Sequence, residues 1–457
     1  MKIDLNSFDE SVLGRHTDDP LRFAFDAKHS AHAGGGSSMV SPQSSTTVLD
    51  KLYQTPGRAG DKRCLYIHVP FCRVRCTFCN FFQNAASRRL VDEYFDALML
   101  EIEQKSQFAW TQSAVFQAVY VGGGTPTDLS SEQIQQLGQR IRSAFPLASD
   151  CEITLEGRIN RFSDEMFERA LEGGFNRFSF GVQSFDTKVR RSAKRLDDRD
   201  TVLERLSQLS ARDDALIIID LLYGLPHQSA EIFEQDLRDF LSTGAHGLDL
   251  YQLVVGGDAP MLNLVEKGKL PPPASSTEKA LLYKIGVEFM RQHHFRPLSV
   301  NHWARDNRER SLYNSLAKTS ADVLPLGCGA GGTLGGYSVM QHRHLQAYLQ
   351  AIETQQMPVM MLSKQHDLAS VFAALKAAFD SGVLRRYALP KVFGVNLFGL
   401  LHPLFVHWDR LGLAKLEKDY LSLTLAGGFW SVTLTQACIR ILLHTYQNTM
   451  KPCLVAS

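Results

Sequence analysis

Three cysteines lie close together near residue 75 and could bind a metal cluster. Cys72, Cys76 and Cys79 have the spacing Cys-x3-Cys-x2-Cys, which brings three thiolates together on one loop. Three thiolates do not complete a tetrahedral zinc site without a fourth ligand, but they suit a [4Fe–4S] cluster that keeps one iron open. Three buried free cysteines are the simpler alternative. The compact spacing beside Pro70 and several polar residues favours the cluster.

Two further positions have residue types that suit ligand binding. The run Gly122–Thr127 reads Gly-Gly-Gly-Thr-Pro-Thr, and glycine lets a backbone approach a ligand closely. Asp220 directly follows the apolar run 215–219. An acid in this position contacts a ligand more often than it lies in a solvated loop. Both positions follow apolar segments of strand length.

A rhythm of strands and helices begins at Cys64 and positions these residues. Amphipathic helices separate six candidate strands, and Ser163 and either Ser130 or Ser131 are suitable helix caps. The expected strands cover 64–68, 118–121, 152–156, 177–181, 216–221 and 248–253. The alternation predicts an α/β fold with a parallel sheet, either open or a partial barrel, with ligands at the carboxyl ends of the strands.

The rest of the chain is predicted to form attachments to this sheet. After about residue 275 the rhythm changes to helices and Gly-rich turns. Gly34–Ser45 has the composition of a flexible loop, whereas Pro20–Phe25 is apolar enough to dock. The predicted parts are an N-terminal extension or flexible lid (1–60), the α/β sheet (61–275), a cap segment (276–365) and a helical C-terminal domain (366–457).

Composition excludes several classes of protein. Of 457 residues, 44% are hydrophobic and 21% are charged, which is typical of a folded chain. Its net charge of +1 argues against nucleic-acid and anionic-membrane partners. The longest apolar stretch, 395–406, is too short to span a bilayer, and the N-terminus lacks the basic and apolar regions of a secretory signal. We therefore expect a cytoplasmic protein without a disulfide framework.

Four ordered motifs resemble those of the radical S-adenosylmethionine (SAM) family, in the branch of oxygen-independent coproporphyrinogen dehydrogenase. They are Tyr-x-His-x-Pro-Phe-Cys at 66–72, Gly-Gly-Gly-Thr-Pro-Thr at 122–127, Gly-Val-Gln-Ser-Phe at 181–185 and Asp-x-x-Tyr-Gly-Leu-Pro at 220–226. The resemblance extends from about Leu65 to Leu334. It implies a radical SAM partial (β/α)6 barrel, a [4Fe–4S] cluster and two SAM molecules, with chemistry that belongs to the cofactor.

The resemblance also implies roles for individual residues. Cys72, Cys76 and Cys79 bind the cluster, and Tyr66, Glu156 and Arg195 serve catalysis. Gln183 and Asp220 bind ribose hydroxyls, Glu156 anchors one SAM and Arg195 binds a SAM carboxylate. The full expected cofactor-binding set is Tyr66, Phe78, Gly123, Gly124, Thr125, Glu156, Gln183, Arg195 and Asp220.

Two members of this branch fit the sequence less well. Coproporphyrinogen III dehydrogenases carry a further cysteine two residues beyond the third ligand, where this chain has Phe81. Haem chaperones, which bind without catalysis, begin close to the cysteine motif and carry Glu-x-Asn-Pro after the third strand. Here 71 residues precede Cys72, and Glu156 is followed by Gly-Arg-Ile-Asn.

A third member, the anaerobilin synthases that degrade haem anaerobically, resembles the chain most. The similar segments are Asp19–Phe25, Leu-Glu-Gly-Arg at 155–158 and Asn301–Arg305. This resemblance implies a C-methyltransferase in which the radical takes hydrogen from the methyl group of a second SAM. The methylene then adds to the porphyrin, the macrocycle opens to a methylated linear tetrapyrrole and iron leaves. A flavodoxin-type protein is the expected electron donor.

Haem requires cationic partners for its propionates and an apolar slot. Arg158 and Arg161 follow Glu156 and are candidates for the propionates, with surface salt bridges as the alternative. His29, His32 and His302 are candidate axial ligands or pocket residues, although the first two are more often solvated loop histidines. Cys328 is expected to be structural. A zinc module using the three cysteines and His68 is the competing class outside the family, and the downstream motifs argue against it.

Overall fold

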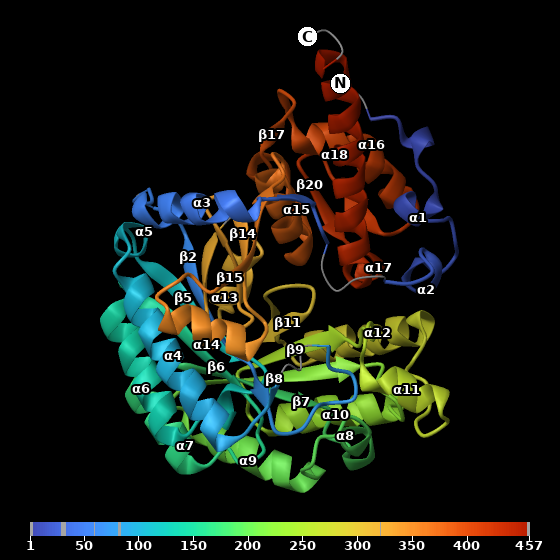
Figure 1. Cartoon of the computed structure of the whole chain (residues 1–457). Coiled ribbons are helices and arrows are strands. Elements are labelled where there is room, and N and C mark those ends of the chain that lie inside the picture. Colours follow the sequence, from blue (N-terminus) through green and yellow to red (C-terminus); the bar gives the residue numbers. More distant parts are fainter. Residues whose placement is uncertain (1–2, 29–32, 59, 81–83, 320, 455–457) are drawn as a thin grey trace. The chain divides into compact units, whose positions relative to one another are not determined.

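The computed structural model describes residues 3–28, 33–58, 60–80, 84–319 and 321–454 (Figure 1). The chain forms two compact units. One comprises Ser37–Pro272 and Ala304–Gln365, and the other comprises the remaining described residues. The four-part division of the sequence stays a prediction.

The first unit is built on parallel strands that run in the order of the sequence. Each hydrogen-bonds in parallel to the next, and each overlaps one of the strands expected from the sequence. The strands are β2 (Arg63–Val69), β5 (Phe116–Gly123), β6 (Leu147–Gly157), β7 (Arg177–Gln183), β8 (Leu216–Tyr223) and β9 (Gly247–Gln252). This arrangement confirms the predicted α/β fold with a partial barrel.

Helices connect these strands and lie along the outer side of the sheet (Figure 1). They are α4 (Arg88–Ser106), α6 (Ser131–Ala144), α7 (Asp164–Gly173), α9 (Arg199–Arg212) and α10 (Ala230–Ser242). The expected caps are present: Ser130 and Gln133 form a reciprocal capping box at α6, and the Ser163 hydroxyl accepts a hydrogen bond from the Met166 amide at α7. The caps fix where each helix leaves the strand before it.

Further strands extend the sheet beyond β2, so the expected change to helices and turns after about residue 275 was wrong for this region. β12 (Asp322–Leu326) runs parallel to β2, with Val323 opposite Cys64. Antiparallel strands follow as β13 (Gly331–Leu334), β14 (Tyr337–Gln341), β15 (Val359–Gln365) and β1 (Ser37–Met39). These short strands pair across large sequence separations, which local periodicity does not reveal.

Part of the expected N-terminal loop is also helical. Residues 42–45, the end of the expected loop, form the first turn of α3 (Pro42–Gln54), whose N-cap is Ser41. Pro42 occupies the first turn, where its fixed φ angle favours a helix and its missing N–H costs nothing. Serine-rich composition therefore indicates a helix start here, not a loop.

The second unit is mostly helical. Its main helices are α12 (Ser276–Gln292), α15 (Ala369–Asp380), α16 (Leu397–Arg410) and α18 (Ser431–Leu454), beside a small sheet of β16 (Val383–Arg385), β20 (Tyr420–Leu423) and β19 (Ala414–Leu416). The indole N–H of Trp408 donates to the Leu13 carbonyl at 3.0 Å, and that of Trp430 donates to the Pro20 carbonyl at 3.1 Å. The apolar N-terminal segment therefore docks on the C-terminal helices. Within the described ranges, each helix is too short or too polar to cross a bilayer.

Candidate functional site

The three cysteines lie on the loop that follows β2. β3 (Phe71–Cys72) pairs with β4 (Asn84–Ala85) and holds the start of this loop. Cys72 and Cys76 are buried, and Cys79 is half-buried. The Cys72 sulfur lies 3.3 Å from the Thr125 hydroxyl, and the Cys76 sulfur accepts a hydrogen bond of 3.4 Å from Arg158. The thiols therefore meet polar partners at the carboxyl ends of the strands.

This donor set fits a [4Fe–4S] cluster better than a single metal ion. Among the residues that the structure describes, no three His, Cys, Asp or Glu side chains converge on one point that could hold a metal ion. In a cluster each thiolate binds a different iron, so the ligand sulfurs do not need to converge. Hydrogen-bond donors beside two of the sulfurs suit a group that carries negative charge.

The glycine run after β5 packs against the cysteine loop. The Gly124 N–H donates to the Val69 carbonyl at 2.8 Å, and a Cβ at Gly124 would lie 2.4 Å from the Phe71 carbonyl oxygen. Gly123 has a φ angle of 116°, which favours glycine. Position 124 therefore requires glycine because the cysteine loop packs directly against it.

Acidic side chains gather near the same strand ends. Glu156, at the end of β6, accepts a hydrogen bond of 3.4 Å from the Gly123 amide, and burial raises its pKa to about 7. Burial, reinforced by the nearby charges of Asp249 and Glu156, raises the pKa of Asp220, which accepts a hydrogen bond from Ser179. Asp249 lies opposite Asp220 on β9. Asp249 was not predicted as a site residue, although an acid within the apolar run 247–250 was a signal.

Gln183 has an unusual backbone conformation. Its φ angle is 73°, and it lies where the register between β7 and β8 shifts. A bulge with a left-handed, non-glycine residue re-aims a side chain at a cost in strain, and such residues concentrate at functional sites. The Gln183 amide nitrogen would lie 2.7 Å from a Cβ at Gly181, so its side chain lies over that glycine.

Arg195 presents a cation that forms no ion pair with the residues the structure describes. Its side chain makes no hydrogen bond with a described residue either, and its Nε is buried. Burial lowers its pKa from the ordinary value. The half-buried guanidinium with an unpartnered Nε can donate hydrogen bonds to a carboxylate ligand.

Tyr66 and Phe78 have aromatic or apolar neighbours. The Tyr66 hydroxyl lies 2.9 Å from Nδ1 of His68, and its ring stacks on Tyr120 and Tyr313. Burial lowers the pKa of His68 to about 4, so this imidazole is neutral near pH 7. Phe78 packs against the apolar cluster of Val189, Leu225, Leu253, Met261 and Leu270.

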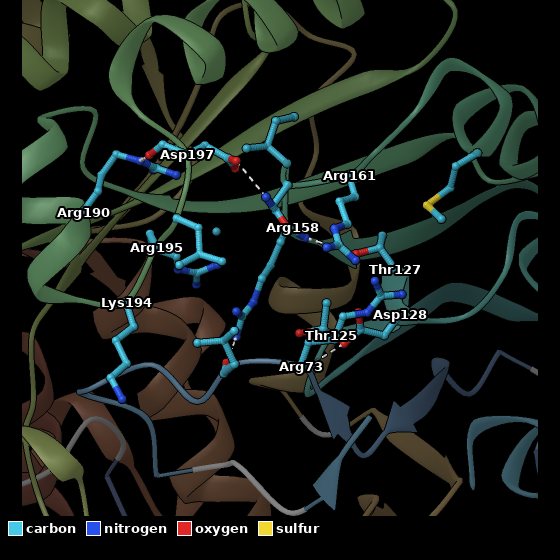
Figure 2. A pocket seen from close by; sticks show the side chains of 16 residues that line it. Arg73, Thr125, Thr127, Asp128, Arg158, Arg161, Arg190, Lys194, Arg195 and Asp197 are labelled. Carbon is cyan, nitrogen blue, oxygen red and sulfur yellow. Dashed lines mark hydrogen bonds and ion pairs between the residues drawn. The ribbon is translucent and has the colours of Figure 1, made fainter. Parts of the chain in front are cut away.

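A basic pocket of about 140 Å³ opens beside the cysteine loop (Figure 2). Asp128 pairs with Arg73 at 2.9 Å, and Arg190 donates to backbone carbonyls of Val182, Ser184 and Asp197. The basic residues that line the pocket are Arg73, Arg158, Arg161, Arg190, Lys194 and Arg195. Within the described part of the chain, the side chains of Arg161, Lys194 and Arg195 have no acidic partner, so the pocket favours an anion.

Comparison with known proteins agrees with this geometry. The model of the radical SAM superfamily matches residues 66–240, which include the cysteine loop, Glu156, Gln183 and Asp220. Anaerobilin synthase of Escherichia coli O157:H7 is 39% identical over 377 residues, covering 82% of this chain and 83% of that protein. The chain belongs to the radical SAM superfamily.

Other members of the superfamily resemble the chain over most of its length. Heme chaperone HemW of Bacillus subtilis is 30% identical, covering 79% of this chain and 95% of that protein. The solved coproporphyrinogen III oxidase HemN from Escherichia coli has a TM-score of 0.72 at 21% identity, covering 88% of this chain and 96% of that chain, and so has the same fold. The cofactors of the radical SAM superfamily are a [4Fe–4S] cluster and SAM.

The roles of the histidines expected near haem stay predictions. His29 and His32 lie outside the described residues, and their role stays a prediction. His302 is buried in the other unit, where its backbone N–H donates to the Ser299 hydroxyl at 3.1 Å. Arg158 and Arg161 line the basic pocket.

Proposed function

We propose that this chain is a radical SAM C-methyltransferase that opens the haem macrocycle anaerobically to a methylated linear tetrapyrrole and releases iron. The observation that carries the proposal is the 39% identity to anaerobilin synthase, which extends over 83% of that protein. The segments Asp19–Phe25, Leu155–Arg158 and Asn301–Arg305, through which the sequence resembles this branch, support it.

In this proposal Cys72, Cys76 and Cys79 hold the cluster and leave one iron open. When bound, the cluster and two SAM molecules supply a 5′-deoxyadenosyl radical and a methyl carbon. The chain orients SAM through the guanidinium of Arg195, whose N–H groups donate hydrogen bonds to the SAM carboxylate. Gln183, at the end of β7, and Asp220, within β8, bind ribose hydroxyls.

The carboxyl group of Glu156 anchors SAM beside the glycine run. It lies next to the Gly123 amide, which fixes the direction of one oxygen. Its raised pKa means that it holds a proton below about pH 7 and accepts hydrogen bonds with both oxygens above that pH. Tyr66 and Phe78 provide apolar surface at the same end of the barrel, which excludes water from a radical.

The basic pocket binds the propionate groups of the substrate in this proposal. Haem carries two carboxylates, and Arg161 and Lys194 have exposed side chains without an acidic partner on the pocket wall (Figure 2). Arg161 and Lys194 have φ angles of 62° and 58°, a left-handed conformation that non-glycine residues adopt at a cost. The guanidinium of Arg158 is already hydrogen-bonded to the cysteine loop, which leaves Arg161 as the stronger propionate candidate.

An anaerobic turnover assay tests the proposal. The full chain with a reconstituted cluster, excess SAM, haem and a low-potential reductant, either chemical or of flavodoxin type, is followed by absorbance and mass spectrometry. We expect loss of the Soret band, a methylated linear tetrapyrrole and 5′-deoxyadenosine, all absent with C76A. Haem that binds and stays intact would support a chaperone like HemW. Decarboxylation of coproporphyrinogen III would support the dehydrogenase.

A further inference from the structure

Arg158 links the end of β6 to the loop between two of the cysteines. One guanidinium nitrogen, Nη2, donates to the Val74 carbonyl at 2.9 Å and to the Cys76 sulfur at 3.4 Å. Val74 lies between Cys72 and Cys76 in the sequence. The same side chain therefore contacts both the backbone of the loop and the sulfur of an expected cluster ligand.

The backbone of Arg158 is itself held in place. Its N–H donates to the Thr127 hydroxyl at 3.3 Å. A Cβ at the preceding Gly157 would lie 2.4 Å from the Thr127 methyl carbon, so a larger residue would displace the Thr127 side chain. The segments that follow β5 and β6 therefore fix the backbone position from which the Arg158 side chain reaches the cysteine loop.

No carboxylate among the described residues forms an ion pair with Arg158. The nearby Asp128 pairs with Arg73 instead. Figure 2 shows Arg158 among the side chains that line the basic pocket. The charge of the guanidinium therefore acts on the Cys76 sulfur without competition from a paired anion.

We propose that Arg158 is a positioning residue for the cluster, which fixes the loop between Cys72 and Cys76 and raises the reduction potential of the cluster. One-electron reduction adds a negative charge, and a cation hydrogen-bonded to a ligand sulfur stabilises the reduced form more than the oxidised form. This inference depends on the cluster and not on the substrate, so it stands whether or not haem is the substrate.

Redox titration of the full chain with a reconstituted cluster, followed by electron paramagnetic resonance, tests the inference. We expect the midpoint potential of R158Q to be more negative than that of the wild type, because glutamine keeps a hydrogen-bond donor but loses the charge. R158K, which keeps the charge, should lie closer to the wild type. R161Q is the matched control, since it removes the same charge from the same loop and Arg161 has no hydrogen bond to a cysteine.

Equal midpoints for R158Q and the wild type would overturn the inference. An equal shift in R161Q would also overturn it, because it would indicate only a general effect of charge. Iron per chain is the second readout. If R158Q folds by circular dichroism but holds no cluster, R158K decides the question. Iron restored by lysine supports the role of the cation, and a folded R158K without iron contradicts it.

Discussion

The guanidinium of Arg177 and the carboxylate of Glu309 form a buried, two-pronged ion pair. Nε of Arg177 lies 3.0 Å from Oε2 of Glu309, and Nη2 lies 3.1 Å from Oε1. Arg177 is the first residue of β7, and both side chains are at most 1% exposed. The pair therefore lies at the amino ends of the parallel strands, whereas the cysteine loop lies at their carboxyl ends. Stability and chemistry are divided between the two ends, as in other barrels.

Removing one member of this pair should strongly destabilise the chain. E309A leaves the buried guanidinium of Arg177 without its counter-charge, and we expect a loss of about 3–5 kcal/mol in the free energy of unfolding. Urea unfolding measures it. R310A is the matched control, because the neighbouring Arg310 pairs with Asp150 on the surface at 2.6 Å and should contribute at most about 1 kcal/mol. Equal losses in the two variants would contradict the prediction.

Cluster binding should require the cysteines of the loop after β2 but not Cys328. C76A removes one of three thiolates, and we expect iron and the visible absorbance of the cluster to be lost after reconstitution. C328A is the control, since the buried Cys328 thiol donates to the Arg343 carbonyl at 3.5 Å in a separate turn. Full iron content is expected for C328A. A C76A variant that keeps the whole cluster would exclude this ligand set.

A methyl group at Gly124 should disrupt the cysteine loop. The Cβ would lie 2.4 Å from the Phe71 carbonyl oxygen, a backbone atom that cannot move without shifting Cys72. We expect G124A to bind less iron than the wild type and to lose at least 1 kcal/mol of stability. G399A tests the general effect of the substitution, because Gly399 is an exposed residue of α16 with no atom near its Cβ position. Helix propensity predicts that G399A gains up to about 1 kcal/mol. Unchanged iron binding in G124A would show that the loop tolerates displacement.

Stability should depend on pH through Glu156. Burial raises the pKa of Glu156 to about 7, so between about pH 4.5 and 7 the folded chain holds a proton that the unfolded chain lacks. The corresponding stabilisation is complete at low pH and is lost as the pH rises through 7. E156Q stays neutral, so its stability relative to the wild type should increase by on the order of 2 kcal/mol between pH 5 and 8, after allowance for solvent screening.

The comparison requires unfolding curves of both proteins at several pH values. E165Q, at an exposed position of α7, corrects for the general loss of a carboxylate. A difference between E156Q and the wild type that is constant with pH would mean that Glu156 ionises at its ordinary pKa. If the stability of E156Q relative to the wild type fell as the pH rose, the pKa of Glu156 would be lowered and not raised. That result would exclude burial as the dominant cause of the pKa shift.

The central strands and the cysteine loop could be predicted from the sequence because their signals are local. Apolar runs of strand length alternate with amphipathic helices, and Ser130 and Ser163 act on amides only three residues away. The spacing of Cys72, Cys76 and Cys79 is likewise a property of eight consecutive residues. A cluster site that depends on such spacing can therefore be predicted without knowledge of the fold.

Contacts between distant segments were decided only by the tertiary structure. Val323 lies opposite Cys64, Glu309 neutralises Arg177, and Asp249 faces Asp220, although no local pattern relates these pairs. The sequence suggested that Arg158 binds a propionate. In the structure its guanidinium donates a hydrogen bond to the Cys76 sulfur. The carboxyl ends of parallel strands meet at one edge of a sheet whatever their separation in the chain. The sequence therefore determined which residues could do chemistry, and the closure of the sheet decided which of them meet.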